Sequence, residues 1–138
     1  MLKGKDLENI IPQSYPMIMI DTLVISDRNK TITDFLIKEE NIFVYEKRLQ
    51  EPGIIENMAQ TAAARSGYKA YTDNTEIRDG YIGAIKNLNI FSLPKINETL
   101  QTTLTPLTDI GNISAVKIET LSGKQKIAEC LMTIILSD

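Results

Sequence analysis

The sequence predicts an α+β fold in which a strongly twisted antiparallel sheet wraps around one long central helix. The segment between Glu51 and Lys69 is Ala-rich and carries small or apolar residues around most of its circumference. A helix with so little polar surface has to be covered on several sides. Two strand-like runs precede it and four follow it, and short turn sequences between such runs favour antiparallel pairing. We expect a single domain, residues 1–138, because a chain of 138 residues can hold one core.

Before the helix, the chain contains one helical turn and two strands. Asp6–Ile11 has the length of a short amphipathic turn, ended by Pro12. Met17–Ser26 is apolar at nearly every position, which predicts a strand covered on both faces. Thr31–Lys38 is β-branched and aromatic, and the turn sequence Asp27–Lys30 would pair it back as a hairpin.

The four apolar runs after the helix are predicted to form a meander of strands. Turn sequences rich in Pro, Gly, Asn and Asp separate them. From Ala128 to Leu136 apolar residues alternate as in a half-buried strand. Pro106 interrupts the second run and predicts a bulge or a sheet edge there. The runs are Tyr81–Phe91, Glu98–Thr108, Asn112–Leu121 and Lys126–Leu136. Strands on both sides of one wrapped helix are typical of the hotdog architecture.

Composition excludes several classes of protein. The net charge of −3 with mixed signs argues against a nucleic-acid surface. No apolar run reaches the roughly 20 residues that cross a bilayer, and the first residues lack the apolar stretch of a secretory signal. We therefore expect a cytoplasmic protein. The one cysteine, Cys130, lies in a strand-like run and is predicted to be a core residue rather than a nucleophile.

Three segments of the chain resemble elements of one known family. Ile11–Asp21 is similar to the family's opening, and Ile55–Gln60, preceded by Pro52 and Gly53, resembles the Glu-x-Met-Ala-Gln element that starts its central helix. Tyr81–Phe91 resembles its third strand. The family that these segments resemble is that of the 3-hydroxyacyl-acyl-carrier-protein dehydratases, which have the hotdog fold. The resemblance implies acyl thioesters of acyl carrier protein or CoA as ligands, in fatty-acid or polyene-type lipid biosynthesis. It also implies a homodimer, or a heterodimer with a related hotdog subunit, and no metal or cofactor.

Glu56 is the predicted catalytic residue, because it is the one carboxylate within the apolar part of the helix. Gln60 follows four residues later on the same face and is predicted to act with it. Dehydration of a 3-hydroxyacyl thioester needs a base for the C2 proton and an acid for the C3 hydroxyl. The resemblance implies that histidine does the first and glutamate the second. Alternatively, Glu56 lies in the first turn and only stabilises the helix dipole, and Gln60 is a satisfied core amide.

Five further residues are predicted to contact the substrate. Gln13 stands where the family has a histidine. Gly53 and Ile54 would offer backbone amides to the thioester oxygen at the helix N-terminus, which the chain enters through Pro52. Gly83 lies within a strand and would mark the close approach of an acyl chain, with a packing glycine as the alternative.

The chain contains no histidine. The family's catalytic histidine precedes the helical glutamate, but here that region, Phe43–Gln50, has no imidazole. In the family the two residues come from opposite subunits, so a chain with Glu56 alone could form a heterodimer with a histidine-bearing partner. Alternatively, Glu56 could act alone, first accepting the C2 proton and then handing it to the leaving hydroxyl on the same face.

Two other functions stay open. One is a hotdog thioesterase in which Glu56 activates water, and the other is a silent acyl-binding subunit. Basic residues that could meet an acidic carrier protein are Lys47, Arg48, Arg65, Lys69, Lys86 and Lys95.

Overall fold

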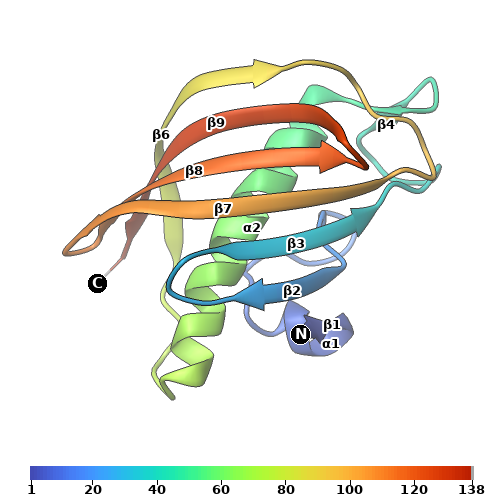
Figure 1. Cartoon of the computed structure of the whole chain (residues 1–138). Helices are drawn as coiled ribbons and strands as arrows, with labels where there is room; N and C mark the ends of the chain where they lie inside the picture. Colours follow the sequence, from blue (N-terminus) through green and yellow to red (C-terminus); the bar gives the residue numbers. More distant parts are fainter. Residues whose placement is uncertain (138) are drawn as a thin grey trace.

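The computed structural model describes residues 1–137 and shows a curved antiparallel sheet with one long helix, α2, against its inner face (Figure 1). This is the hotdog arrangement that the sequence predicts. The elements are β1 (Leu2–Lys3), α1 (Gly4–Glu8), β2 (Thr22–Ser26), β3 (Thr31–Leu36), β4 (Val44–Tyr45), β5 (Arg48–Leu49), α2 (Glu51–Thr72), β6 (Gly80–Ile90), β7 (Thr99–Ile110), β8 (Ile113–Ser122) and β9 (Gln125–Leu136).

The sheet has the strand order β1-β2-β3-β7-β8-β9-β6, and β4 pairs with β5 separately. The predicted meander is therefore confirmed for β7, β8 and β9 and wrong for β6, which lies at the edge beside β9 (Figure 1). Strand β7 pairs with β3 on one side and β8 on the other, so β6 cannot lie beside it, and β6 pairs with the free side of β9 instead. Residues 91–98 connect β6 at the edge of the sheet to β7 at its centre.

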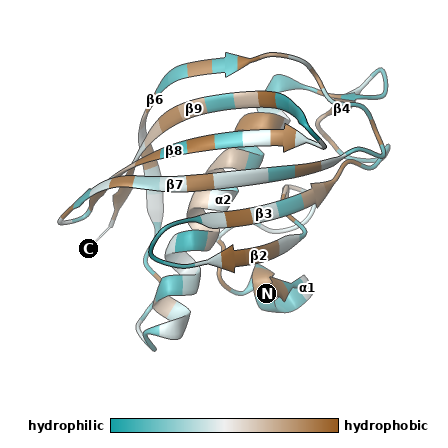
Figure 2. Ribbon diagram, viewed as in Figure 1, coloured by the Kyte–Doolittle hydropathy of each residue, from teal (hydrophilic) through white to brown (hydrophobic). Residues whose placement is uncertain are grey.

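Hydrophobic and polar residues alternate along several strands, and the alternation that was predicted between Ala128 and Leu136 is clearest in the first half of β9. Figure 2 shows hydrophobic residues separated by polar ones along β3 and β8. In β9, Ala128, Cys130 and Met132 are all buried in the core against α2. The pairing of β7 with β8 shifts between Pro106 and Thr108, which confirms the predicted bulge.

Helix α2 begins at Glu51, so Glu56 lies in its second turn and the prediction of a first-turn position was wrong. Pro52 and Gly53 are part of the helix, because the first turn needs no backbone N–H from proline. The acidic residue of the first turn is Glu51. The dipole explanation therefore applies to Glu51 and leaves Glu56 to be explained by its surroundings.

The buried face of α2 is less apolar than the sequence suggested. Asn57 is fully buried; its Nδ2 donates to the Met19 carbonyl at 2.7 Å, and its Oδ1 accepts a hydrogen bond from Thr102 Oγ1 at 2.6 Å. Thr61 Oγ1 lies 2.8 Å from Thr33 Oγ1 on β3. Satisfied polar networks of this kind fix the orientation of a buried element. The helix is thus held in register with the sheet by hydrogen bonds as well as by packing.

The predicted strand Met17–Ser26 is confirmed only from Thr22 onward. From Met17 to Met19 the backbone hydrogen-bonds to side chains of α2: Gln60 contacts the Met17 carbonyl and the Met19 amide, and Asn57 contacts the Met19 carbonyl. Only at Asp21 does an amide of this segment donate to β3, at the Asp34 carbonyl. An apolar run shows that a segment is buried, but not which groups satisfy its backbone. No helix within residues 1–137 has both the length and the apolar character to cross a membrane.

Cys130 is buried on β9, with its Sγ 3.8 Å from Met58 Sδ, and burial raises the pKa of its thiol to about 11. Because the thiolate is the reactive form, the native thiol should be unreactive at pH 8. We expect iodoacetamide to leave the native protein unlabelled over a period that fully labels the protein unfolded in urea, as followed by mass spectrometry. Rapid labelling of the native protein would contradict this packing.

Candidate functional site

A cavity of about 360 Å³ lies beside α2, with Glu56 in its wall. Three separate parts of the chain enclose it: the segment 9–13, one face of α2, and residues 77–82 together with the end of β9. Most of the lining is apolar and consists of Ile10, Ile11, Pro12, Ala59, Ala62, Ala63, Ile77, Ile82, Ile134 and Leu136. A concave apolar cavity with a few polar groups is the usual form of a small-molecule site.

The Glu56 carboxylate is held in place by Gln60. Gln60 Nε2 donates to Glu56 Oε1 at 2.9 Å and to the Met17 carbonyl at 2.7 Å, and its Oε1 accepts the Met19 amide at 2.6 Å. Gln60 is fully buried. It is therefore a satisfied core amide and a support for the half-buried Glu56 at once. Its bond to Oε1 leaves the second oxygen of Glu56 for a bound molecule.

Gln13 lines the same cavity as Glu56, although the two residues are 43 positions apart in the sequence. Its Oε1 is buried and has no hydrogen-bond partner within residues 1–137. An unsatisfied buried polar group costs about 1–3 kcal/mol, which a hydroxyl or N–H of a ligand would offset. Gln13 and Glu56 are thus two of the polar residues in the cavity wall, together with Asn9, Ser66, Arg78, Asp79 and Tyr81.

The predicted residues at the start of α2 lie elsewhere. Pro52, Gly53 and Ile54 do not line the cavity. The amides of Gly53 and Ile54 both donate to the Gln50 carbonyl, at 2.9 and 3.3 Å, and are not free to bind an oxyanion. A Cβ on Gly53 would lie 2.7 Å from Phe43 Cβ, so close packing explains this glycine. The thioesterase alternative therefore lacks the amide donors that it was expected to use.

Gly83 is also outside the cavity wall. It lies on β6 where the pairing with β9 shifts, and a Cβ there would approach Ile135 Cδ1 to 2.8 Å. The packing alternative accounts for it. Sequence reasoning missed Tyr81 and Ile82, which do line the cavity. Their strand was predicted, but no local signal shows which of its residues meet the segment 9–13.

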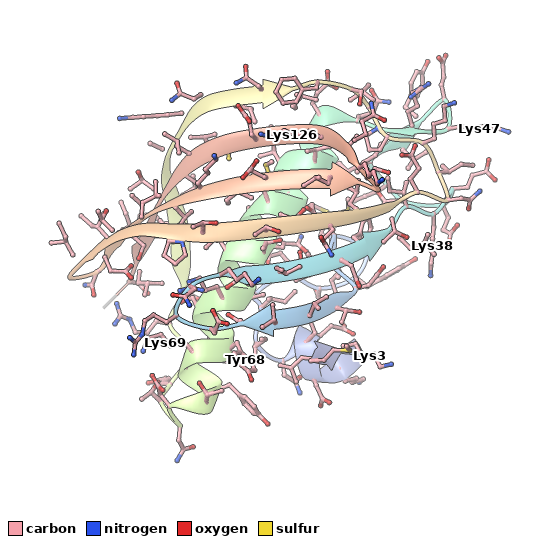
Figure 3. All side chains as sticks on the ribbon, in the orientation of Figure 1. Lys3, Lys38, Lys47, Tyr68, Lys69 and Lys126 are labelled. Atoms are coloured by element: carbon pink, nitrogen blue, oxygen red, sulfur yellow. The ribbon has the colours of Figure 1, made fainter. Side chains whose placement is uncertain are left out.

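The basic residues proposed for carrier-protein docking do not form one surface. Figure 3 shows Lys47 and Lys69 at opposite sides of the molecule. The guanidinium of Arg65 donates to the Asp27 carbonyl and to Thr31 Oγ1, each at 2.8 Å, and so holds the turn between β2 and β3. Within the described part of the chain, no group of Cys, Asp and Glu side chains is arranged to hold a metal ion.

Comparison with solved structures confirms the hotdog fold. The dehydratase heterocomplex ApeI:P from Xenorhabdus doucetiae matches with a TM-score of 0.90 at 12% identity, over 100% of this chain and 93% of that chain. Cj0977, a sigma28-regulated virulence protein from Campylobacter jejuni, matches with a TM-score of 0.74 at 14% identity, over 96% of both chains. A hypothetical thioesterase with coenzyme A from Streptococcus pneumoniae matches with a TM-score of 0.69 at 7% identity, over 84% of both chains.

At these identities the solved structures show the fold alone, so the family has to come from the sequence. Comparison with curated proteins gives no match. The sequence model of the family described as ApeP-like, ApeP dehydratase, matches residues 5–136. This range includes Gln60 and every residue that lines the cavity, Gln13 and Glu56 among them. The chain therefore belongs to the ApeP-like dehydratase family.

Proposed function

We propose that the protein is the carboxylate-bearing subunit of a heterodimeric dehydratase that removes water from 3-hydroxyacyl thioesters. One observation carries the proposal: Glu56, oriented by Gln60, lines an apolar cavity in a chain without histidine. Membership of a dehydratase family supports the reaction class. The solved structure from X. doucetiae is described as a dehydratase heterocomplex, and this supports the two-subunit arrangement.

The reaction needs two proton transfers. A base takes the proton from C2, the C3–O bond breaks, and the departing hydroxyl takes a proton from an acid, which gives a 2-enoyl thioester and water. Protonated Glu56 is the acid in this proposal, and an imidazole of the partner is the base. Solvent then carries the proton from the imidazolium back to Glu56. Gln13 Oε1, which is buried without a partner, would accept the hydrogen of the C3 hydroxyl and hold it near Glu56.

Strand β6 offers the place for the partner. It is an edge strand of 11 residues, paired on one side with β9, and most of its residues are exposed. A long exposed edge is a template for a strand of another subunit. Gly80, Tyr81 and Ile82 belong to this strand and also line the cavity. A subunit added along β6 would therefore lie next to the site and could place an imidazole in it.

Complementation tests the proposal. A histidine-bearing hotdog protein of the same organism is prepared with its own helical carboxylate replaced by glutamine, which inactivates it alone. Mixing it with this chain is expected to restore formation of 2-enoyl thioester, and native mass spectrometry is expected to show one copy of each subunit. Each protein alone serves as the control.

Other outcomes of the same assay would reject the proposal. Water loss by this chain alone would show that no partner imidazole is needed. Release of free thiol would indicate a thioesterase. A mixed dimer that binds thioester but forms neither product would identify a silent acyl-binding subunit.

A further inference from the structure

We infer that a second cavity, on another face of α2, binds a phosphate group, carried either by inorganic phosphate or by a small phosphomonoester. The cavity has a volume of about 370 Å³ and lies between the turn that joins β2 to β3, the C-terminal half of α2 and the end of β7 (Figure 1). It shares no residue with the cavity beside Glu56, so the inference does not depend on the proposed function.

The wall of this second cavity is polar and mostly charged. Arg28, Arg65 and Lys69 line it, together with Asp27, Asp109 and three side chains that carry hydroxyl groups. No aliphatic side chain within residues 1–137 contributes to it, in contrast to the cavity beside Glu56. An apolar ligand would leave these groups unsatisfied, so the wall suits a charged ligand with several hydrogen-bonding atoms.

The guanidinium of Arg65 is half-buried without a carboxylate in direct contact. Its Nη1 donates to the Asp27 carbonyl and to Thr31 Oγ1, and its Nη2 donates to the Arg28 carbonyl at 3.3 Å. All three acceptors are neutral oxygens, and Arg65 takes part in none of the ion pairs that form within residues 1–137. A guanidinium has five N–H donors, so these bonds leave donors for a ligand. Removing water from a charge without a counter-ion is unfavourable, and a bound anion would offset this cost.

The two carboxylates in the wall are bound to other parts of the chain. Asp27 Oδ1 accepts the backbone amides of Asn29 and Lys30, at 2.8 and 3.0 Å, which closes the turn between β2 and β3. Asp109 Oδ1 accepts a hydrogen bond from Ser114 Oγ. With three basic and two acidic side chains, the wall has a net positive charge, although the whole chain has a net charge of −3. This excess of positive charge is local and favours an anion.

Arg28 and Lys69 can turn towards a ligand at little cost. The guanidinium of Arg28 is exposed and has no hydrogen bond or ion pair in the described part of the chain. Lys69 Nζ lies 2.8 Å from Asp73 Oδ2, but both side chains are exposed, and pairs of this kind contribute little to stability. Guanidinium groups match the oxygens of phosphate in a bidentate way, and an ammonium group adds a further donor.

A phosphate group fits these donors in charge and in number of acceptors. A phosphate monoester carries about −1.5 to −2 charges at pH 7 and three strong acceptor oxygens. A carboxylate has one charge and two oxygens, so it would leave more of the donors unused. The cavity has room for on the order of twelve groups of the size of a water molecule, at about 30 Å³ each. A small organic group attached to the phosphate would therefore fit beside it and meet the hydroxyl groups of the wall.

Calorimetric titration of the full-length protein tests the site, with inorganic phosphate and glycerol 3-phosphate as separate probes and sodium chloride to keep the ionic strength constant. One phosphate group should bind per chain, and the Tm should rise with the probe concentration, because the ligand binds the folded chain. Acetate should bind at least tenfold more weakly. Tighter binding of glycerol 3-phosphate would identify a phosphomonoester as the ligand, and tighter or equal binding of inorganic phosphate would identify the free ion.

Arg28→Gln and Lys69→Gln should each weaken phosphate binding at least fivefold, and both positions are exposed, so folding should be unaffected. Lys30→Gln is the matched control, because it removes the same charge from the same turn and lies outside the cavity wall. It should bind phosphate as the unchanged protein does. The inference would be overturned by the absence of saturable binding, by acetate binding as tightly as phosphate, or by an equal loss of affinity in Lys30→Gln and Arg28→Gln.

Discussion

Glu56→Gln is expected to lower the rate of dehydration by the heterodimer about a hundredfold to ten-thousandfold, the range typical of a general acid. Glutamine has nearly the size of glutamate and can still accept the hydrogen bond from Gln60 Nε2. It cannot supply a proton to the leaving hydroxyl. The initial rate of 2-enoyl thioester formation in the complemented mixture measures the effect.

Glu51→Gln is the control for this substitution. Glu51 is exposed in the first turn of the same helix and lies outside the cavity wall. It loses only a dipole interaction worth about 0.3–1 kcal/mol, so the rate should be unchanged. Glu56→Gln should still bind acyl pantetheine, because the apolar residues of the cavity wall are unchanged. If Glu56→Gln kept full activity, the proposed role of this carboxylate would be wrong.

The central part of the site could be predicted because it lies within one helix. Helical spacing alone places Glu56 and Gln60 on the same face, and they are hydrogen-bonded in the structure. The opposite wall could not be predicted, because segment 9–13 and residues 77–82 are far from Glu56 in sequence. The sequence placed the start of the helix after Glu51, and on that basis the backbone amides of Gly53 and Ile54 were expected to be free to bind the thioester oxygen. In the structure the helix begins at Glu51, and the amides of Gly53 and Ile54 both donate to the Gln50 carbonyl.

In the fold, too, the features that depend on neighbouring residues could be predicted, and those that depend on residues far apart in the sequence could not. Apolar runs and turn sequences located every long strand, because these depend on neighbouring residues. They did not show that β6 pairs with β9, because the hydrophobic pattern of one strand does not determine which strand it pairs with. On β3 the buried face carries Thr31 and Thr33, whereas Ile32 is partly exposed. The hydroxyl of Thr33 can be buried because it is hydrogen-bonded to the hydroxyl of Thr61 on α2. The sequence of β3 by itself does not predict this contact.

The second large effect is expected at Gly67, where α2 crosses the N-terminal segment. A Cβ at this position would lie 1.9 Å from the Ile10 carbonyl oxygen and 2.9 Å from its carbonyl carbon, far inside ordinary contact distance. The obstacle is backbone, so no side-chain rotation relieves it. In an ordinary helix, replacing glycine with alanine stabilises by about 0.5–1 kcal/mol. At Gly67 the effect on stability has the opposite sign, and we expect Gly67→Ala to destabilise the protein by about 3 kcal/mol or more.

Thermal unfolding followed by circular dichroism measures this effect, and the expected loss in Tm is about 10 °C or more. Ser66→Ala is the neighbouring control, and its stability should change by no more than about 0.5 kcal/mol. The segment that Gly67 contacts continues from Ile10 to Gln13 and forms one wall of the cavity. If the added methyl group pushes this segment away from α2, Gln13 moves away from Glu56 as well. Gly67→Ala should then bind acyl pantetheine more weakly even at temperatures where it is folded. An unchanged or raised Tm would show that helix and segment are not in direct contact.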